Sequence, residues 1–158
     1  MAPSGPLTVE LGNLADPLDD KSAWVPWVDG QDAVLEPGVQ GGFHVLMKMR
    51  VSGPMPARFV LNKWARRVDD EKLVLRSMIT VEPDGSRTAT GAWEMDGTRM
   101  FMCPSPIGIS VIDRRIRFEV ILADDGGVQL GRGAVTLQPR CPTDSADYLA
   151  FCQKICTG

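Results

Sequence analysis

Apolar and polar residues alternate along several short stretches of this chain. In residues 43–51 (FHVLMKMRV), five apolar side chains occupy alternate positions: Phe43, Val45, Met47, Met49 and Val51. The positions between them hold a more polar set: His44, Leu46, Lys48 and Arg50. The same period of two recurs in residues 73–81 and 115–122. This pattern predicts antiparallel β-strands with one face toward a core and the other toward water.

Turn-forming residues separate these stretches along the whole chain. Segments rich in glycine, proline or aspartate occur at 28–32, 36–42, 52–56, 68–72, 82–86, 95–98 and 124–127. In the last of them, Asp125–Gly126 is a hairpin signal between two apolar runs. Short strands with this punctuation predict an all-β sandwich or barrel of about nine antiparallel strands.

Residues 143–158 follow a different pattern and predict a short C-terminal helix. Three capping candidates precede it: Thr143, Asp144 and Ser145. Apolar residues and cysteines then recur at helical spacing: Leu149, Cys152, Ile155 and Cys156. We therefore expect a flexible N-terminus over 1–6, a β-sandwich over 7–142, and a helix with its tail over 143–158.

The four cysteines lie in the last part of the chain: Cys103, Cys141, Cys152 and Cys156. An even number favours disulfides, which persist outside the cytosol. Two cysteines four apart on one helix have poor geometry for bonding each other. We expect one of them to bond Cys103 and the other Cys141, with the pairing left open, so that the helix is stapled to the sandwich. A Cys₄ zinc site, without C-x₂-C pairs, and free buried thiols are the alternatives.

Composition and charge exclude several classes of protein. With 158 residues and a net charge of −3, the chain is a single globular domain without the basic surplus of a nucleic-acid-binding protein. Arginines cluster near residues 66–67 and 114–117, but acids stand beside them. No apolar run is long enough for a transmembrane segment. The start MAPSGPLTVE lacks the regions of a signal peptide, so an extracytoplasmic location implies a signal sequence not present in this chain.

Catalytic patterns are missing from the sequence. His44 is the only histidine and lies within a predicted strand, so a Ser-His-Asp or Cys-His arrangement is not expected. The chain has neither a nucleophile elbow nor a phosphate-binding loop. Two carboxylates that are distant in the sequence can form a catalytic pair without any sequence motif, so this arrangement stays an alternative. We expect no enzyme, no catalytic residue and no cofactor.

A copper site is the sharpest alternative, because thioethers and thiolates select Cu(I). Its candidate ligands are His44, Met100, Met102 and Cys103. A regular strand over residues 43–51 would place His44 on the face opposite Met47 and Met49, and only a bulge would bring them together. Tryptophans are candidates for a ligand surface or for the core: Trp24, Trp27, Trp64 and Trp93. Trp24 and Trp27, three apart, should point to opposite faces of a strand.

Three segments carry a resemblance to a group of proteins: PGVQGGFHVLMKMRV (37–51), IRFEVILADDGG (116–127) and GAVTLQP (133–139). The chain resembles uncharacterised bacterial envelope proteins, often predicted lipoproteins. The resemblance implies an immunoglobulin-like sandwich but no site residue. This chain departs from the group by lacking a lipobox cysteine near its start. We expect a non-enzymatic, extracytoplasmic interaction or binding module, whose partner is another protein or an envelope component. A periplasmic copper- or other metal-binding protein is the alternative.

Overall fold

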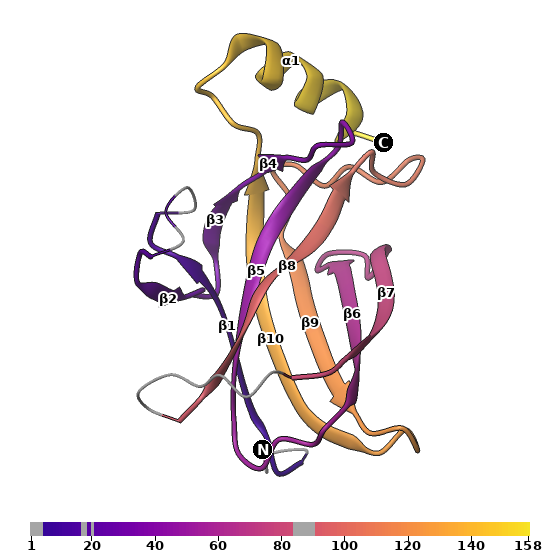
Figure 1. Cartoon of the computed structure of the whole chain (residues 1–158). Helices are drawn as coiled ribbons and strands as arrows, with labels where there is room; N and C mark the ends of the chain where they lie inside the picture. Colours follow the sequence, from indigo (N-terminus) through magenta and orange to yellow (C-terminus); the bar gives the residue numbers. More distant parts are fainter. Residues whose placement is uncertain (1–4, 17–18, 20, 84–90) are drawn as a thin grey trace.

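The computed structural model describes residues 5–16, 19, 21–83 and 91–158, which form two β-sheets and one short helix (Figure 1). Sheet A contains β1 (Thr8–Leu14), β2 (Trp24–Pro26), β4 (Glu36–Pro37), β5 (Phe43–Ser52) and β8 (Trp93–Cys103). Sheet B contains β3 (Gln31–Val34), β6 (Phe59–Arg67), β7 (Leu73–Val81), β9 (Ile116–Ala123) and β10 (Gln129–Arg140). The all-β prediction is confirmed at this level. The described part holds ten strands rather than about nine, because β2 and β4 are too short to read from a pattern.

Strand β5 is the centre of sheet A, and β10, β9 and β6 form the middle of sheet B. β8 pairs with β5 along one edge, while β1 and β4 share the other edge of β5. The order in sheet B is β3-β10-β9-β6-β7, with β3 parallel to β10 and the other pairs antiparallel. The predicted Asp125–Gly126 hairpin joins β9 to β10, where the Asp124 carboxylate accepts from the backbone N–H of Gly126 and Val128.

The core lies between the two sheets and includes the residues that the alternation predicts in β5 and β9. In β7 the prediction is wrong in part, because Val74 is buried while Leu73 and Ile79 are each 39% exposed. Five side chains of β5 are at most 1% exposed: Phe43, Val45, Met47, Met49 and Val51. Four side chains of β9 are fully buried: Ile116, Phe118, Val120 and Leu122. The prediction of a wet opposite face on β5 is wrong. His44 and Lys48 are only 4% and 9% exposed, because neighbouring side chains of sheet A pack over that face.

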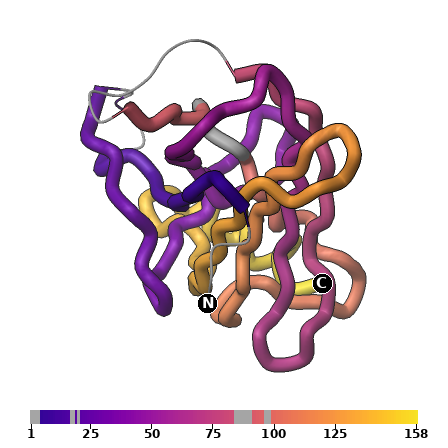
Figure 2. Tube along the Cα trace, turned by 90° about the horizontal axis from the view of Figure 1, so that it is seen from below, coloured from indigo at the N-terminus to yellow at the C-terminus, as the bar shows by residue number. Residues whose placement is uncertain are grey.

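The two lateral sides of the sandwich differ, and we name them by that difference. On the closed side, β3 and β4 form one extended segment that leaves sheet B and joins sheet A, with the fully buried Leu35 between them. Leu7 also donates its backbone N–H to Leu130, linking the start of β1 to β10. On the open side, β7 and β8 end their sheets, and no ladder joins them over the described residues. Seen from below, the violet β3–β4 segment and the magenta β6–β7 hairpin lie on opposite sides (Figure 2).

Helix α1 (Ala146–Ile155) covers one end of the sandwich (Figure 1). Its N-cap is Ser145, whose hydroxyl accepts from the backbone N–H of Tyr148. Disulfides join Cys156 to Cys103 at the end of β8, and Cys152 to Cys141 just beyond β10. Both helix cysteines therefore bond outside the helix, as expected from their spacing, and α1 ties a strand of each sheet together.

One predicted turn lies within a strand, and another lies partly outside the described residues. The turn expected at 95–98 lies inside β8, where the register against β5 shifts between Met47 and Met49. The glycine and aspartate of this segment therefore mark an irregularity within a strand and not a turn that reverses the chain. The turn expected at 82–86 and the flexible terminus at 1–6 fall partly outside the described residues.

Candidate binding site on the outer face of sheet B

The outer face of sheet B carries long polar and aromatic side chains from neighbouring strands. In the β6–β7 and β6–β9 registers, Trp64 lies opposite Arg76 on one side and Glu119 on the other. We call the following group the Trp64 platform: Trp64, Arg66, Arg76, Arg117, Glu119 and Ile121. All of its members except Arg76 line an open depression of about 220 Å³.

Two guanidinium groups flank the Trp64 indole. The Arg76 guanidinium carbon lies 4.5 Å from the ring centroid, and that of Arg66 lies 5.5 Å from it. These distances are typical of cation–π contacts, which hold a guanidinium in place without neutralising it. The indole Nε1 is buried and has no hydrogen-bond partner among the described residues.

Carboxylates pair with some of the arginines on this face but not with those beside Trp64. Arg117 donates to both oxygens of Glu71 at 3.1 and 2.8 Å, and this contact raises the pKa of Arg117 and lowers that of Glu71. Arg132 donates to Glu119 at 2.8 Å. Within the described part of the chain, Arg66 reaches only the Glu71 carbonyl at 3.4 Å, and Arg76 forms no ion pair. Neither of the two guanidiniums beside Trp64 bonds a carboxylate among the described residues, although the charge of Arg66 contributes to lowering the pKa of Glu71.

This arrangement suits the binding of a carboxylate. Guanidinium groups present planar, paired donors that match carboxylates. Ile121 and the indole add apolar surface beside those donors.

The side chains of the copper alternative do not converge. His44 lies on the outer face of sheet A, opposite Phe101 in the register. Met100 and Met102 are at most 1% exposed in the core between the sheets, and Cys103 is bonded to Cys156. The described β5 alternates regularly, and the extra residues at both register shifts belong to β8. His44 therefore stays on the face away from the thioethers.

His44 instead faces a carboxylate. Its Nε2 lies 3.7 Å from Glu36 Oε2, and its Nδ1 has no hydrogen-bond partner among the described residues. Burial, and secondarily the nearby Arg99, lowers the pKa of His44, while burial raises the pKa of Glu36. Both shifts favour the neutral forms of the two side chains.

The four cysteines form a compact sulfur cluster where α1 meets the sheets. The sulfur atoms of Cys152 and Cys156 lie 3.6 Å apart, although each is bonded elsewhere. Cys141 belongs to the same cluster, within 4.8 Å of both. Disulfide sulfurs are not the thiolates that zinc or copper requires. The cluster is therefore a double staple in this structure.

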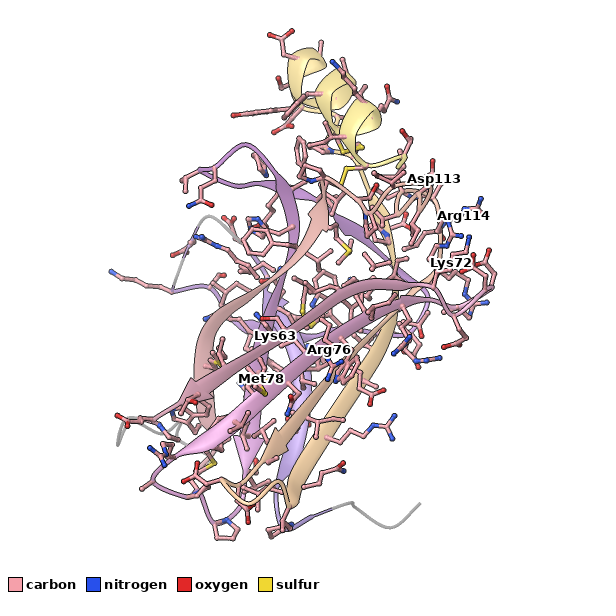
Figure 3. The ribbon with its side chains drawn as sticks, turned by 90° about the vertical axis from the view of Figure 1, so that its right-hand side faces the viewer. Lys63, Lys72, Arg76, Met78, Asp113 and Arg114 are labelled. Carbon is pink, nitrogen blue, oxygen red and sulfur yellow. A yellow bond between two sulfur atoms is a disulfide. The ribbon has the colours of Figure 1, made fainter. Side chains whose placement is uncertain are left out.

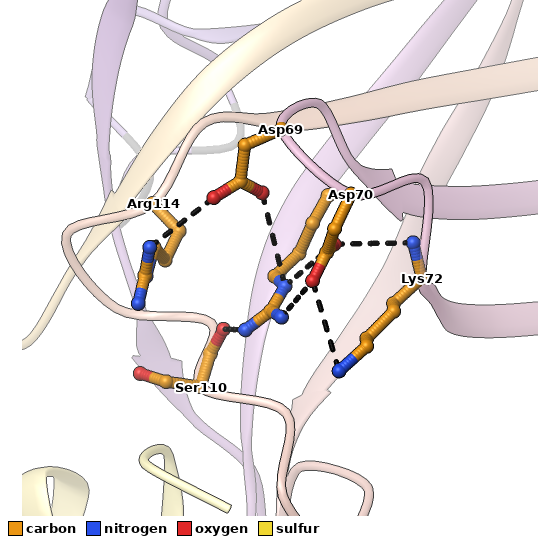
Figure 4. Close-up of polar contacts among 6 residues, drawn as sticks. Asp69, Asp70, Lys72, Ser110 and Arg114 are labelled. Carbon is orange, nitrogen blue, oxygen red and sulfur yellow. Dashed lines mark hydrogen bonds and ion pairs between the residues drawn. The ribbon is translucent and has the colours of Figure 1, made fainter.

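A second charged cluster surrounds Arg67 at the β6–β7 turn (Figure 4). The buried Arg67 guanidinium bonds both oxygens of Asp70 and donates to the Ser110 carbonyl at 3.3 Å. The hydrogen bonds from Arg67 lower the pKa of the Asp70 carboxyl to about 2. Arg114 and Asp69 extend the network at 3.2 Å. Its charges are compensated, so it anchors the turn to the segment before β9 and offers no open site.

Sequence reasoning placed the tryptophans only in part. Trp27 packs against the core and Trp24 stacks under Arg50 at 4.1 Å, on opposite faces as their spacing predicted. Trp93 is buried against Phe59. The Trp64 platform was missed, because Arg66 is its neighbour by alternation but Arg76 joins it only through the cross-strand register. A W-x-R pattern on one predicted strand, with an unpaired arginine on the next, is the signal that points to it.

Comparison with known proteins finds no protein-family model that matches this chain and no curated protein that matches it. In the described residues, the one helix is far shorter than a bilayer crossing requires.

Proposed function

We propose that this chain is a non-enzymatic, extracytoplasmic binding module that recognises an acidic segment of a partner through the Trp64 platform. The observation that carries the proposal is the pair of guanidiniums of Arg66 and Arg76 on the half-buried Trp64 ring, neither of which bonds a carboxylate among the described residues. Arg117 and Arg132 of the same face already bond carboxylates, so Arg66 and Arg76 are the platform arginines left for a ligand carboxylate. An immunoglobulin-like sandwich in the bacterial envelope, which the resemblance implies, is part of the proposal.

Disulfides and sheet geometry support this assignment. Two disulfides are compatible with an oxidising compartment. A rigid antiparallel sheet holds the platform side chains in fixed register, which lowers the entropy lost on binding. The proposed ligand is a polypeptide segment rich in aspartate or glutamate, because paired guanidinium donors match carboxylate oxygens.

The test measures binding of a hexaglutamate peptide by tryptophan fluorescence and calorimetry. We expect the wild-type protein to bind with an affinity that falls as salt rises. The double substitution Arg66→Ala/Arg76→Ala should weaken binding about 10- to 100-fold, which corresponds to about 1.4–2.7 kcal/mol for the two partly exposed charge pairs together. Trp64→Phe should remove the fluorescence change.

The matched control is Arg115→Ala, since Arg115 is exposed and lies outside the platform. It should bind the peptide like wild type. Equal affinities of wild type and the double variant would overturn the proposal. Stronger binding of a sulfated oligosaccharide than of the peptide, with the same dependence on Arg66 and Arg76, would keep the site but replace its ligand.

A further inference from the structure

The edges of the two sheets are protected unequally against pairing with another strand. Exposed strand edges recruit other strands unless they are short, charged or interrupted by proline. β2 and β4 are three and two residues long and each contains a proline. β3 is four residues long. β8 is longer, but it carries Glu94 and Arg99 and has two register shifts.

β7 has little of this protection. It is nine residues long, contains neither proline nor glycine, and carries a single charge, Arg76. Leu73 and Ile79 are each 39% exposed and Met78 is 70% exposed. Figure 3 views this open side, with Arg76 and Met78 on the strand that ends sheet B. One edge of β7 pairs with β6, and no described strand pairs with the other.

The sequence of β7 is chemically close to a palindrome about Ser77. Antiparallel pairing of two copies centred on Ser77 places Leu75 opposite Ile79 and Arg76 opposite Met78. Val74 then meets Thr80. Leu75 and Ile79 therefore meet apolar partners and Val74 meets the small Thr80. Each Arg76 lies opposite a Met78, so the two Arg76 side chains are kept apart. Cross-strand pairs of this kind are the unit of sheet stabilisation.

Neighbouring registers are worse. When a twofold axis perpendicular to the sheet relates two antiparallel strands, residues that lie opposite each other point to the same face. The alternative registers are therefore those in which the axis passes through a neighbouring residue instead of Ser77. Centring on Arg76 sets two guanidiniums directly opposite each other, which is destabilising. Centring on Met78 sets Val74 opposite Glu82. The register about Ser77 also brings Lys72 of one copy near Glu82 of the other, within reach of a long side chain even though a bulge at Val74 shifts that end by one residue.

We propose that β7 pairs antiparallel with β7 of a second copy of this chain, about a dyad at Ser77, so that the two sheets B become one continuous sheet. This dimer is inferred from the exposed edge of β7 and does not depend on the proposed ligand. It sets the two Trp64 rings on one face of that sheet about 16 Å apart, from strand spacing and rise. Such a dimer would present two platforms to one extended partner.

The test uses position 78, which the register places opposite Arg76 of the other copy. Met78→Lys should weaken the dimer at least tenfold, because two like-charged pairs form across the dyad. Met78→Glu should tighten it severalfold, because each new carboxylate meets an Arg76 guanidinium. Sedimentation over a range of concentrations measures both, without any ligand. Since Met78 is exposed, neither substitution should disturb the fold of the single chain, which circular dichroism checks.

Cysteine cross-linking tests whether two β7 strands pair in the register centred on Ser77. Ser77→Cys should form a disulfide-linked dimer in a glutathione redox buffer, because residues at the dyad face each other within about 5.5 Å. Thr80→Cys is the matched control, since two copies of position 80 lie about 20 Å apart in this register. A wild-type protein that stays monomeric at millimolar concentration would overturn the proposal. So would equal weakening by Met78→Lys and Met78→Glu, or cross-linking at position 80 as fast as at position 77.

Discussion

The closed and open sides of the sandwich enclose the same core by different means. On the closed side, one extended segment passes from sheet B to sheet A, and the backbone N–H of Leu35 donates to Arg140 between its two halves. On the open side, Lys63 reaches from sheet B to the Arg99 carbonyl of β8 at 3.4 Å. One side is joined by main chain, whereas a side-chain hydrogen bond spans the other.

The difference shows where the stability of the open side comes from. Over its described length β8 forms a ladder with β5 only, so its far edge adds no strand pairing. Its last residue, Cys103, is bonded to α1, and α1 is bonded in turn to Cys141 next to β10. The helix thus holds an open-side strand to a closed-side strand at one end of the molecule. Covalent bonds there replace the ladder that β7 and β8 do not form.

The largest expected effect comes from removing that link. Replacing Cys103 and Cys156 by alanine should destabilise the protein by about 4 kcal/mol, and replacing Cys141 and Cys152 by about 3 kcal/mol, in the chain-entropy account. The order follows from sequence separations of 53 and 11 residues. Urea unfolding of each variant measures the loss.

Thiol titration of the unfolded wild-type protein is the control, and it should find no free thiol. A larger loss from the Cys141–Cys152 pair than from the Cys103–Cys156 pair would contradict the order that the loop lengths predict.

The second prediction compares one buried and one exposed aliphatic side chain from the two sides. Leu35→Ala should cost about 2–5 kcal/mol, because Leu35 is fully buried where the chain changes sheets and leaves a cavity when truncated. Ile79→Ala on β7 should cost less than about 1 kcal/mol, because that side chain already contacts water. Thermal and urea unfolding at a concentration below that of self-association measure both. Similar losses of stability for Leu35→Ala and Ile79→Ala would contradict the difference in packing between the closed and open sides.

Alternation in the sequence predicted which side chains share a face in β5 and β9. It failed at the start of β7, where the bulge at Val74 places Leu73 opposite Arg66 and Leu75 opposite the buried Ala65. Phe43 and its alternate neighbours are buried, and the helix cysteines bond outward, because both depend on local geometry. The burial of His44 was not predicted, since a period of two says nothing about what covers the other face. The paths of β3, β4 and β7 through the sheets depend on pairing between distant segments. The Arg76–Trp64 contact depends on the same pairing and was missed for the same reason.

The smallest expected effect concerns Lys63, the buried cation of the open side. Burial lowers the pKa of its ammonium group. Because the unfolded chain then holds the proton more tightly than the folded chain, Lys63 destabilises the protein at neutral pH. That penalty declines as pH rises through the lowered pKa and vanishes above the ordinary lysine value of about 10.4. Lys63→Met should therefore stabilise the protein by about 1 kcal/mol at pH 7, and by less as pH approaches 10.

Urea unfolding of wild type and Lys63→Met at several pH values between 7 and 10 measures this difference. Lys72→Met is the control, because Lys72 is half-exposed at the β6–β7 turn, and its removal should change stability by less than about 0.5 kcal/mol. If Lys63→Met were less stable than wild type by a constant amount at every pH, the hydrogen bond to Arg99 would outweigh the cost of burying the ammonium. The Lys63 side chain would then stabilise the contact between sheet B and β8 on the open side.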